Sequence, residues 1–200
     1  MADSRLIELS GSSGEEPEPE AAFYFDLSSP ECWLVAERVI QTLGRPAPWI
    51  PVLSSALPGG GAAEQQLSIE QVAELAASRG LLPVRAPAQP QVPTAEAMMA
   101  ATFAQQSGKV VAYTLAAMRQ CWCAGRDLSD HSTLFLAGAA SEIHPNALEK
   151  AFGLKSLRAQ LDRQTEKAAE YGVTQVPAIR VGRTIHFGDS GLTSAAVESL

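Results

Sequence analysis

Apolar residues recur at helical spacing along most of this chain, and shorter apolar runs near both ends have the pattern of strands. The aromatic-rich run at 21–27 (AAFYFDL) and the apolar run at 48–53 (PWIPVL) predict two strands. Between them, apolar positions repeat at helical spacing from 30 to 43, and Gly44 supplies a helix stop. The first part of the chain therefore predicts a β-α-β unit.

A helical block follows this unit. Ser68 is a candidate cap for the first of its helices, and a glycine ends several of the others. The predicted helices lie at 68–80, 94–108, 109–125, 131–140, 145–152 and 155–171.

The pattern changes again after the last of these helices. Strands are predicted at 177–181 and 184–187, joined by the two-residue turn Gly182-Arg183. GDSG (188–191) is predicted to turn the chain into a short final helix. The element order predicts an α/β fold in which a βαβ unit and a ββα unit are separated by an all-helical insertion.

Composition narrows the class of protein. With 200 residues, 46% of them hydrophobic and 18% charged, the chain can build one good core. Residues 1–20 carry −5 of the net charge of −7, because they hold six acidic residues and one arginine. We expect this segment to be a disordered acidic tail. The nearly neutral remainder argues against a nucleic-acid partner.

The sequence also bears on location. We see no signal peptide and no apolar run long enough to span a bilayer, so we expect neither secretion nor a membrane partner. Three cysteines suit a reducing compartment better than a disulfide framework. We therefore expect a cytoplasmic protein.

The stretch FYFDLSSPECW (23–33) places Ser29-Pro30-x-Cys32 where the first strand runs into the first helix. Serine is a preferred N-cap and proline a preferred first helical residue. One interpretation is therefore that the pair serves only to start the helix. Ser28 competes with Ser29 for the cap. Alternatively, a hydroxyl at this position can donate a hydrogen bond to a bound anion.

This motif, the element order and the later GVTQVPAIRVGRTIHFGDSG (172–191) together resemble the thioredoxin fold, in its DsbA branch with a helical insertion. More narrowly, the chain resembles kappa-class glutathione transferases and 2-hydroxychromene-2-carboxylate isomerases. SRGLLPV, MAATFAQQSGKVVAYTLAAMRQ and AGRDLSD are also similar to the isomerase group, and the resemblance extends over residues 22–199. It implies a thioredoxin-like domain at 21–66 and 155–200 and an insertion at 67–154.

The resemblance implies roles for the first motif. Redox members of the fold begin this helix with Cys-Pro-x-Cys, and here the first cysteine is replaced by Ser29. Serine cannot form a mixed disulfide, which excludes two-cysteine cycling. The role implied for Ser29 is to stabilise the thiolate of bound glutathione, with Ser28 beside it. Cys32 is either a redox-sensitive thiol or a small buried residue.

The second motif is implied to complete the site. The proline that matches Pro177 is cis in thioredoxin-like folds, which leaves the backbone of Val176 able to pair with an extended thiol peptide. The glutathione-using relatives have Gly-[Asn/Ser]-Asp-Arg at the following corner. Here Asp189 and Ser190 stand at the middle positions and Gly191 replaces the arginine. Asp189 is expected to bind the ammonium group of the thiol peptide, or the corner is only a turn with a helix cap.

Other polar candidates carry less information. Cys121 and Cys123 are two apart on a predicted helix, a spacing that suits neither a disulfide nor zinc. The three histidines, at 131, 144 and 186, have no nucleophile or metal ligand at useful spacing and are expected to be structural. We predict no metal site.

The resulting expectation is a glutathione-dependent isomerase or transferase of the 2-hydroxychromene-2-carboxylate isomerase type, acting on a small aromatic substrate. The cofactor would be glutathione or another low-molecular-weight thiol, and the resemblance implies a homodimer. Two alternatives remain open: a DsbA-like thiol–disulfide oxidoreductase that uses Cys32 alone, and a thioredoxin-fold binding protein without catalysis.

Overall fold

The computed structural model describes residues 20–60, 67–88 and 95–199. The predicted tail at 1–20 therefore lies outside the described residues except for Glu20. Within the described ranges, no helix is both long enough and apolar enough to cross a membrane.

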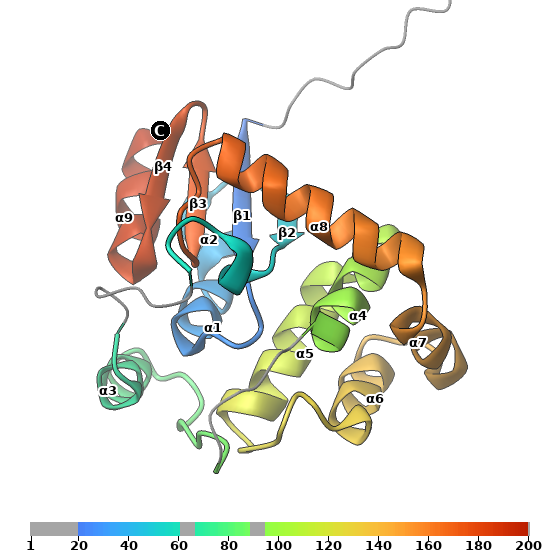
Figure 1. The fold of residues 1–200 in the computed structure, drawn as a ribbon. Coiled ribbons are helices and arrows are strands. Elements are labelled where there is room, and N and C mark those ends of the chain that lie inside the picture. The colour runs from blue at the N-terminus through green and yellow to red at the C-terminus, as the bar shows by residue number, and fades with distance from the viewer. Residues whose placement is uncertain (1–19, 61–66, 89–94, 200) are drawn as a thin grey trace, which may run out of the picture.

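A four-stranded mixed sheet forms the centre of the fold, in the order β2-β1-β3-β4 (Figure 1). The central strand β1 (Ala21–Phe25) pairs in parallel with β2 (Trp49–Pro51) and antiparallel with β3 (Ala178–Val181). β4 (Thr184–Phe187) forms the other edge of the sheet, antiparallel to β3. The predicted α/β architecture, with a hairpin after the helical region, is confirmed.

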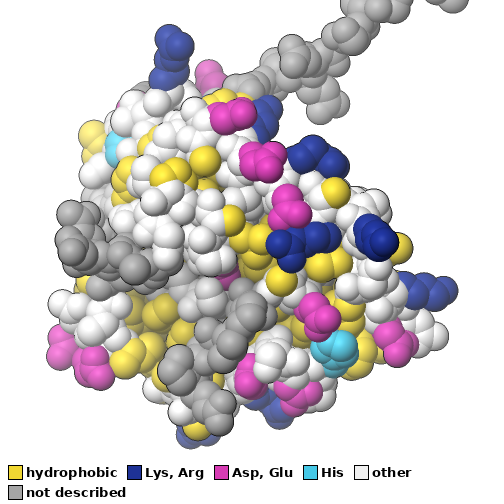
Figure 2. Space-filling model, viewed as in Figure 1, with side chains coloured by type: hydrophobic (Ala, Val, Ile, Leu, Met, Phe, Trp, Pro, Cys, Tyr) yellow, Lys and Arg dark blue, Asp and Glu magenta, His cyan; other side chains and the backbone are white. Residues whose placement is uncertain are grey.

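Helices cover both faces of this sheet. α1 (Pro30–Ala36), α2 (Val39–Leu43) and α9 (Gly188–Glu198) pack together on one face. α8 (Lys155–Glu170) crosses the other face (Figure 1), and charged side chains follow its outer side (Figure 2). Because side chains alternate along a strand, neighbouring residues of β1 contact different helices.

The helical block lies between β2 and α8 in the chain. A 3₁₀ turn, η1 (Ser54–Ala56), follows β2, and the next helix begins with a capping box between Ser68 and Gln71. The described helices of the block agree with the predicted ones to within a few residues at their ends. They are α3 (Ile69–Ser78), α4 (Ala95–Gln106), α5 (Val110–Trp122), α6 (His131–Ala140) and α7 (Pro145–Phe152).

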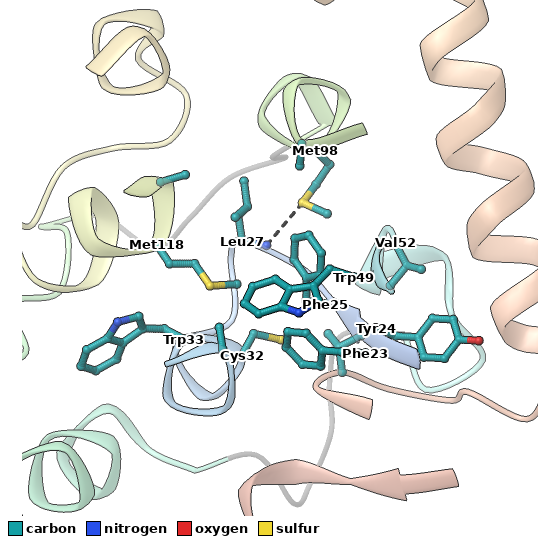
Figure 3. Packing of buried hydrophobic residues seen from close by; sticks show 14 of the residues in the cluster. Phe23, Tyr24, Phe25, Leu27, Cys32, Trp33, Trp49, Val52, Met98 and Met118 are labelled. Atoms are coloured by element: carbon teal, nitrogen blue, oxygen red, sulfur yellow. Dashed lines mark hydrogen bonds between the residues drawn. The ribbon is translucent and has the colours of Figure 1, made fainter. Parts of the chain in front are cut away.

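Aromatic side chains of β1 and β2 cluster beside Met98 and Met118 of the helical block (Figure 3). The ring of Trp49 meets Phe23 edge to face at 5.0 Å between centroids. The end of β1 is then tied to two helices of the block, because the Leu27 N–H donates to Met98 Sδ (3.3 Å) and Trp122 Nε1 donates to the Leu27 carbonyl (3.1 Å). The turn after β1 is therefore held from the side of the insertion as well as by the sheet.

The structure corrects two predicted elements. The helix predicted at 30–43 is interrupted at Glu37 and Arg38, which separate α1 from α2. The final helix begins at Gly188, so GDSG forms the first turn of α9 instead of preceding it. Asp189 and Ser190 therefore belong to a helix start, and Gly188 enters it with a left-handed φ of +72°.

Gly191 allows α9 to approach β4 closely. A Cβ at this position would lie 2.9 Å from the backbone carbon of His186, so no larger side chain fits without a shift of the helix. We expect Gly191→Ala to lower the free energy of unfolding by about 1–3 kcal/mol through overpacking, measured by urea denaturation. The matched control Ser194→Ala, on an exposed position of the same helix, should change it by less than about 0.5 kcal/mol. Equal stability of the two variants would contradict the close approach.

Candidate functional site

Asp26 shapes the turn between β1 and α1. Its carboxylate is buried (2% exposed) and accepts hydrogen bonds from the backbone N–H (2.9 Å) and hydroxyl (2.8 Å) of Ser28 and from the Ser54 N–H (2.9 Å). The Ser28 hydroxyl, predicted as part of the ligand site, is thus held by Asp26 and does not cap the helix. The competition between the two serines is settled in favour of Ser29.

Ser29 is the N-cap of α1. Its Oγ accepts the backbone N–H of Cys32 (3.2 Å), and the side chain is only 6% exposed. A hydroxyl that accepts one bond still has its own proton to donate. No bond from that proton to the described part of the chain occurs in the structure. The cap and the anion-donor role predicted for Ser29 are therefore compatible.

Cys32 lies in the core, with its side chain directed towards Phe23 (Figure 3). It is 0% exposed, and burial raises the pKa of the thiol far above its ordinary value. The neighbouring Asp26 backbone and Ser29 side chain lower that pKa, but burial outweighs them. A neutral thiol sealed in the core cannot attack a disulfide, which argues against the single-cysteine interpretation of this residue.

Glu31 connects the start of α1 to the start of α9. Its buried carboxylate accepts the Asp189 N–H at Oε1 (2.7 Å) and the Leu67 N–H at Oε2 (3.5 Å). Burial raises the pKa of Glu31, and the nearby Asp189 charge adds to the rise. No local pattern in the sequence indicates this connecting role, because Glu31 and Asp189 are 158 positions apart.

Asp189 is placed differently from the expectation that it binds a ligand's ammonium group. Arg79 donates hydrogen bonds to both carboxylate oxygens of Asp189, through Nη1 to Oδ1 (2.7 Å) and through Nη2 to Oδ2 (2.5 Å). Arg38 also donates to Oδ1 (3.0 Å). Two guanidinium groups from α1–α2 and the end of α3 thus hold a carboxylate that is 9% exposed. No local pattern in the sequence could have paired these residues, because they are 110 and 151 positions apart from Asp189.

The second predicted motif contacts the first at Gly188 and Asp189, where β4 turns into α9. The Val176–Pro177 bond is cis, as predicted, and the Pro177 carbonyl accepts the Gly188 N–H (2.9 Å). Glu31 and Pro177 therefore both contact the Gly188–Asp189 corner, one from α1 and one from the start of β3. Ser190, the remaining predicted ligand residue, is exposed beside this corner.

The remaining cysteines and histidines lie in other surroundings. Cys121 is buried and Cys123 half-buried, and both are free thiols. His131 contacts Glu96 (2.8 Å), and His186 contacts Glu198 (2.7 Å) on α9.

The sequence matches the model of the DSBA-like thioredoxin domain family over residues 21–196. The chain belongs to this family. No curated protein matches the sequence.

Solved structures with the same fold have low sequence identity. One is a 2-hydroxychromene-2-carboxylate isomerase (TM-score 0.74, 19% identity, covering 90% of this chain and 92% of the other). A probable DsbA oxidoreductase from Streptomyces coelicolor has a TM-score of 0.72 at 15% identity, covering 90% and 88%. The cytosolic disulfide reductase DsbM from Pseudomonas aeruginosa, solved with GSH, has a TM-score of 0.61 at 14% identity, covering 90% and 95%. At these identities the likeness establishes the fold alone.

The burial of the thiols predicts low reactivity of the native protein. Burial raises the pKa of Cys123 to about 11, so about one thousandth of this thiol is ionised at pH 8. We expect an aromatic disulfide reagent at pH 8 to label at most Cys123, slowly, and to label all three cysteines in guanidinium chloride. Cys123→Ala should abolish the native reaction and Cys32→Ala should leave it unchanged. Rapid labelling of Cys32 would contradict its placement.

Because the pKa of Glu31 is raised, we predict that the free energy of unfolding depends on pH. The folded state holds this proton more tightly than the unfolded state, so ionising Glu31 destabilises the fold. Compared with Glu31→Gln, which keeps an acceptor for the Asp189 N–H, the wild type should lose stability as the pH rises from about 4.5 through the raised pKa. The difference should then level off.

Urea unfolding of both proteins from pH 4 to 8 measures this difference. Relative to Glu31→Gln, Glu31→Ala leaves the Asp189 N–H without its acceptor and should cost about 1–3 kcal/mol throughout the range. If the stability of the wild type relative to Glu31→Gln stayed constant or increased with pH, the burial of the charged form would be contradicted.

Proposed function

We propose that this protein is a thiol-dependent isomerase or transferase of the 2-hydroxychromene-2-carboxylate isomerase type, with Ser29 as the residue that stabilises the thiolate of glutathione or a similar small thiol. The observation that carries the proposal is the geometry of Ser29. Its oxygen accepts the Cys32 N–H, and its proton is directed to no described residue, at the corner where the starts of α1, β3 and α9 meet.

Among the residues of the site, Ser29 fits the thiol group of such a ligand. A serine hydroxyl suits a thiolate, since it donates a hydrogen bond without competing as a nucleophilic sulfur. When bound, the thiol supplies a nucleophile that adds reversibly to an aromatic substrate and leaves after bond rotation, so that none is consumed. Ser29 lowers the free energy of the anion, and a stabilisation of ~1.4 kcal/mol lowers the thiol pKa by about one unit.

The acidic corner fits the rest of the ligand in a different way from the relatives. Asp189 is held by Arg38 and Arg79, so it does not present a bare carboxylate to an ammonium group. The two guanidinium groups remain about one quarter exposed, at 26% and 24%. Arginine binds carboxylates through its planar set of donors. We therefore propose that Arg38 and Arg79 contact a carboxylate of the thiol peptide and take the place of the arginine that Gly191 has replaced.

One observation favours a second function. Ser29 is only 6% exposed, which would suit a thioredoxin-fold binding protein whose hydroxyl serves only as a helix cap. The two functions differ in whether removal of the Ser29 hydroxyl changes the binding of a small thiol.

Calorimetric titration with reduced glutathione from pH 6 to 9 provides that test. We expect Ser29→Ala to weaken binding about tenfold at neutral pH and to raise the pKa of the bound thiol by about one unit, because the thiolate loses its donor. Ser29→Thr keeps both hydroxyl and cap and should retain most of the affinity. Ser190→Ala changes an exposed residue beside the Gly188–Asp189 corner and serves as the control for Ser29→Ala.

Thermal unfolding separates binding from folding in these variants, since loss of an N-cap costs about 1 kcal/mol by itself. If the wild type binds glutathione with the same affinity and pH profile as a folded Ser29→Ala variant, Ser29 is a cap only. If neither the wild type nor any variant binds glutathione, the glutathione assignment fails.

A further inference from the structure

A surface hollow of about 500 Å³ lies at the C-terminal end of α5, where the segment that follows α3 passes it (Figure 1). One wall is the stretch 82–85, whose last residue donates its backbone N–H to the Trp122 carbonyl (2.7 Å). The other wall is the last turn of α5 and the two residues after it. The volume falls within the roughly 300–1,000 Å³ of small-molecule sites. No lining residue belongs to the Ser29 corner.

Arg119 presents a guanidinium group of fixed orientation to this hollow. Its Nε and Nη2 donate to the two carboxylate oxygens of Glu37 (2.7 Å each), and Trp33 Nε1 in turn donates to Glu37 (2.9 Å). This bidentate pair does not use Nη1, and the Arg119 side chain is 46% exposed whereas that of Glu37 is 10% exposed. Arg119 is therefore oriented to donate to a further acceptor, although its charge is already paired.

Arg85 supplies positive charge that Glu37 does not offset. It is exposed, and it forms no ion pair with any residue that the structure describes. Its aliphatic stem lies against the backbone that follows α5, because a Cβ on Gly125 would be 3.1 Å from Arg85 Cγ. This contact and the backbone bond to Trp122 hold the base of the Arg85 side chain beside the hollow.

The rest of the hollow combines apolar surface with one amide. Leu82 is a large hydrophobic residue that is 50% exposed, and the half-buried Val84 lines the same wall. Covering such side chains removes apolar surface from water, which is favourable in proportion to the area covered. The side chain of Gln120 makes no hydrogen bond within the described part of the chain, so it is available to a ligand as donor or acceptor.

We propose that this hollow binds a small organic acid with an apolar body. The carboxylate accepts hydrogen bonds from Arg85 and from Nη1 of Arg119, and the body covers Leu82 and Val84. None of the described lining residues is acidic, and the two guanidinium charges exceed the single charge of Glu37, so the hollow favours an anion. The apolar body is essential, because a partly exposed ion pair contributes little by itself.

Cys123 makes occupancy of the hollow observable. It is a half-buried free thiol in the wall, and it is the cysteine that we expect to react in the native protein. A bound acid would shield the thiol from a reagent and would place a negative charge beside it, which disfavours the thiolate. The rate of labelling of Cys123 therefore reports on this hollow and not on the Ser29 corner.

Calorimetric titration of the full chain with 2-naphthoate at pH 8 tests the site. Arg85→Met should weaken binding about five- to tenfold, because the carboxylate loses a charged donor. The matched control Arg126→Met removes the same charge from a nearby exposed residue outside the lining and should bind as the wild type does. Neutral 2-naphthamide, and acetate, which lacks the apolar body, should each bind at least about tenfold more weakly than 2-naphthoate.

Two further measurements place the ligand. Saturating 2-naphthoate should slow the reaction of Cys123 with an aromatic disulfide reagent at least about fivefold, with its half-effect at the calorimetric Kd. Ala124→Trp, at an exposed position of the wall, should fill the hollow and weaken binding at least about tenfold without a change of charge. Thermal unfolding confirms that each variant is titrated in its folded form.

Three results would each refute the site. They are the absence of 2-naphthoate binding to the wild type, binding that folded Arg85→Met or Ala124→Trp leaves unchanged, and bound ligand that does not slow the labelling of Cys123. The last result would place the acid elsewhere on the protein.

Discussion

The buried carboxylate of Glu31 fixes how the two halves of the fold meet. It accepts the backbone N–H of Asp189, 158 positions away, and so joins the first turn of α1 to the first turn of α9. A buried carboxylate is costly unless its oxygens are hydrogen-bonded, so its presence favours the one arrangement that supplies donors. Gly188 belongs to the same constraint, because a Cβ there would lie 2.9 Å from Glu31 Oε1.

The charges around this contact explain why α3 is part of the site. Glu31 and Asp189 place two acidic groups close together, and the guanidinium groups of Arg38 and Arg79 lie against Asp189. Arg79 stands at the end of α3, so the same ion pair that offsets the acidic charge also fastens the start of the helical block to α9. Breaking such a partly buried pair on one side leaves a charge without compensation, which costs more than the pair contributes when intact.

Elements set by short-range chemistry could be predicted from the sequence, and contacts between distant segments could not. Ser68, Gly44 and Pro145 mark helix ends through capping and backbone preference, and the structure has helix ends at these positions. The cis bond before Pro177 followed from a family resemblance. The ion pairs of Asp189 with Arg38 and Arg79 join residues 151 and 110 positions apart, which no local pattern identifies. The break at Glu37 and Arg38 interrupts apolar positions that repeat at helical spacing. The start of α9 was predicted too late because GDSG has turn composition, but Gly188 turns the chain in a single residue.

Strand alternation in β1 separates the two faces on which the polar chemistry lies. Phe23 and Phe25 pack with Trp49 into a continuous aromatic layer beneath α1, and this layer seals Cys32 from solvent. Tyr24, between them in sequence, faces α8 and contacts Arg180. A one-residue slip of β1 would exchange these sets, placing Tyr24 in the aromatic layer and two phenylalanines against Arg180. The register that keeps the thiol buried beside Ser29 therefore also places the Tyr24 hydroxyl against Arg180, so one strand sets the contacts on both faces of the sheet.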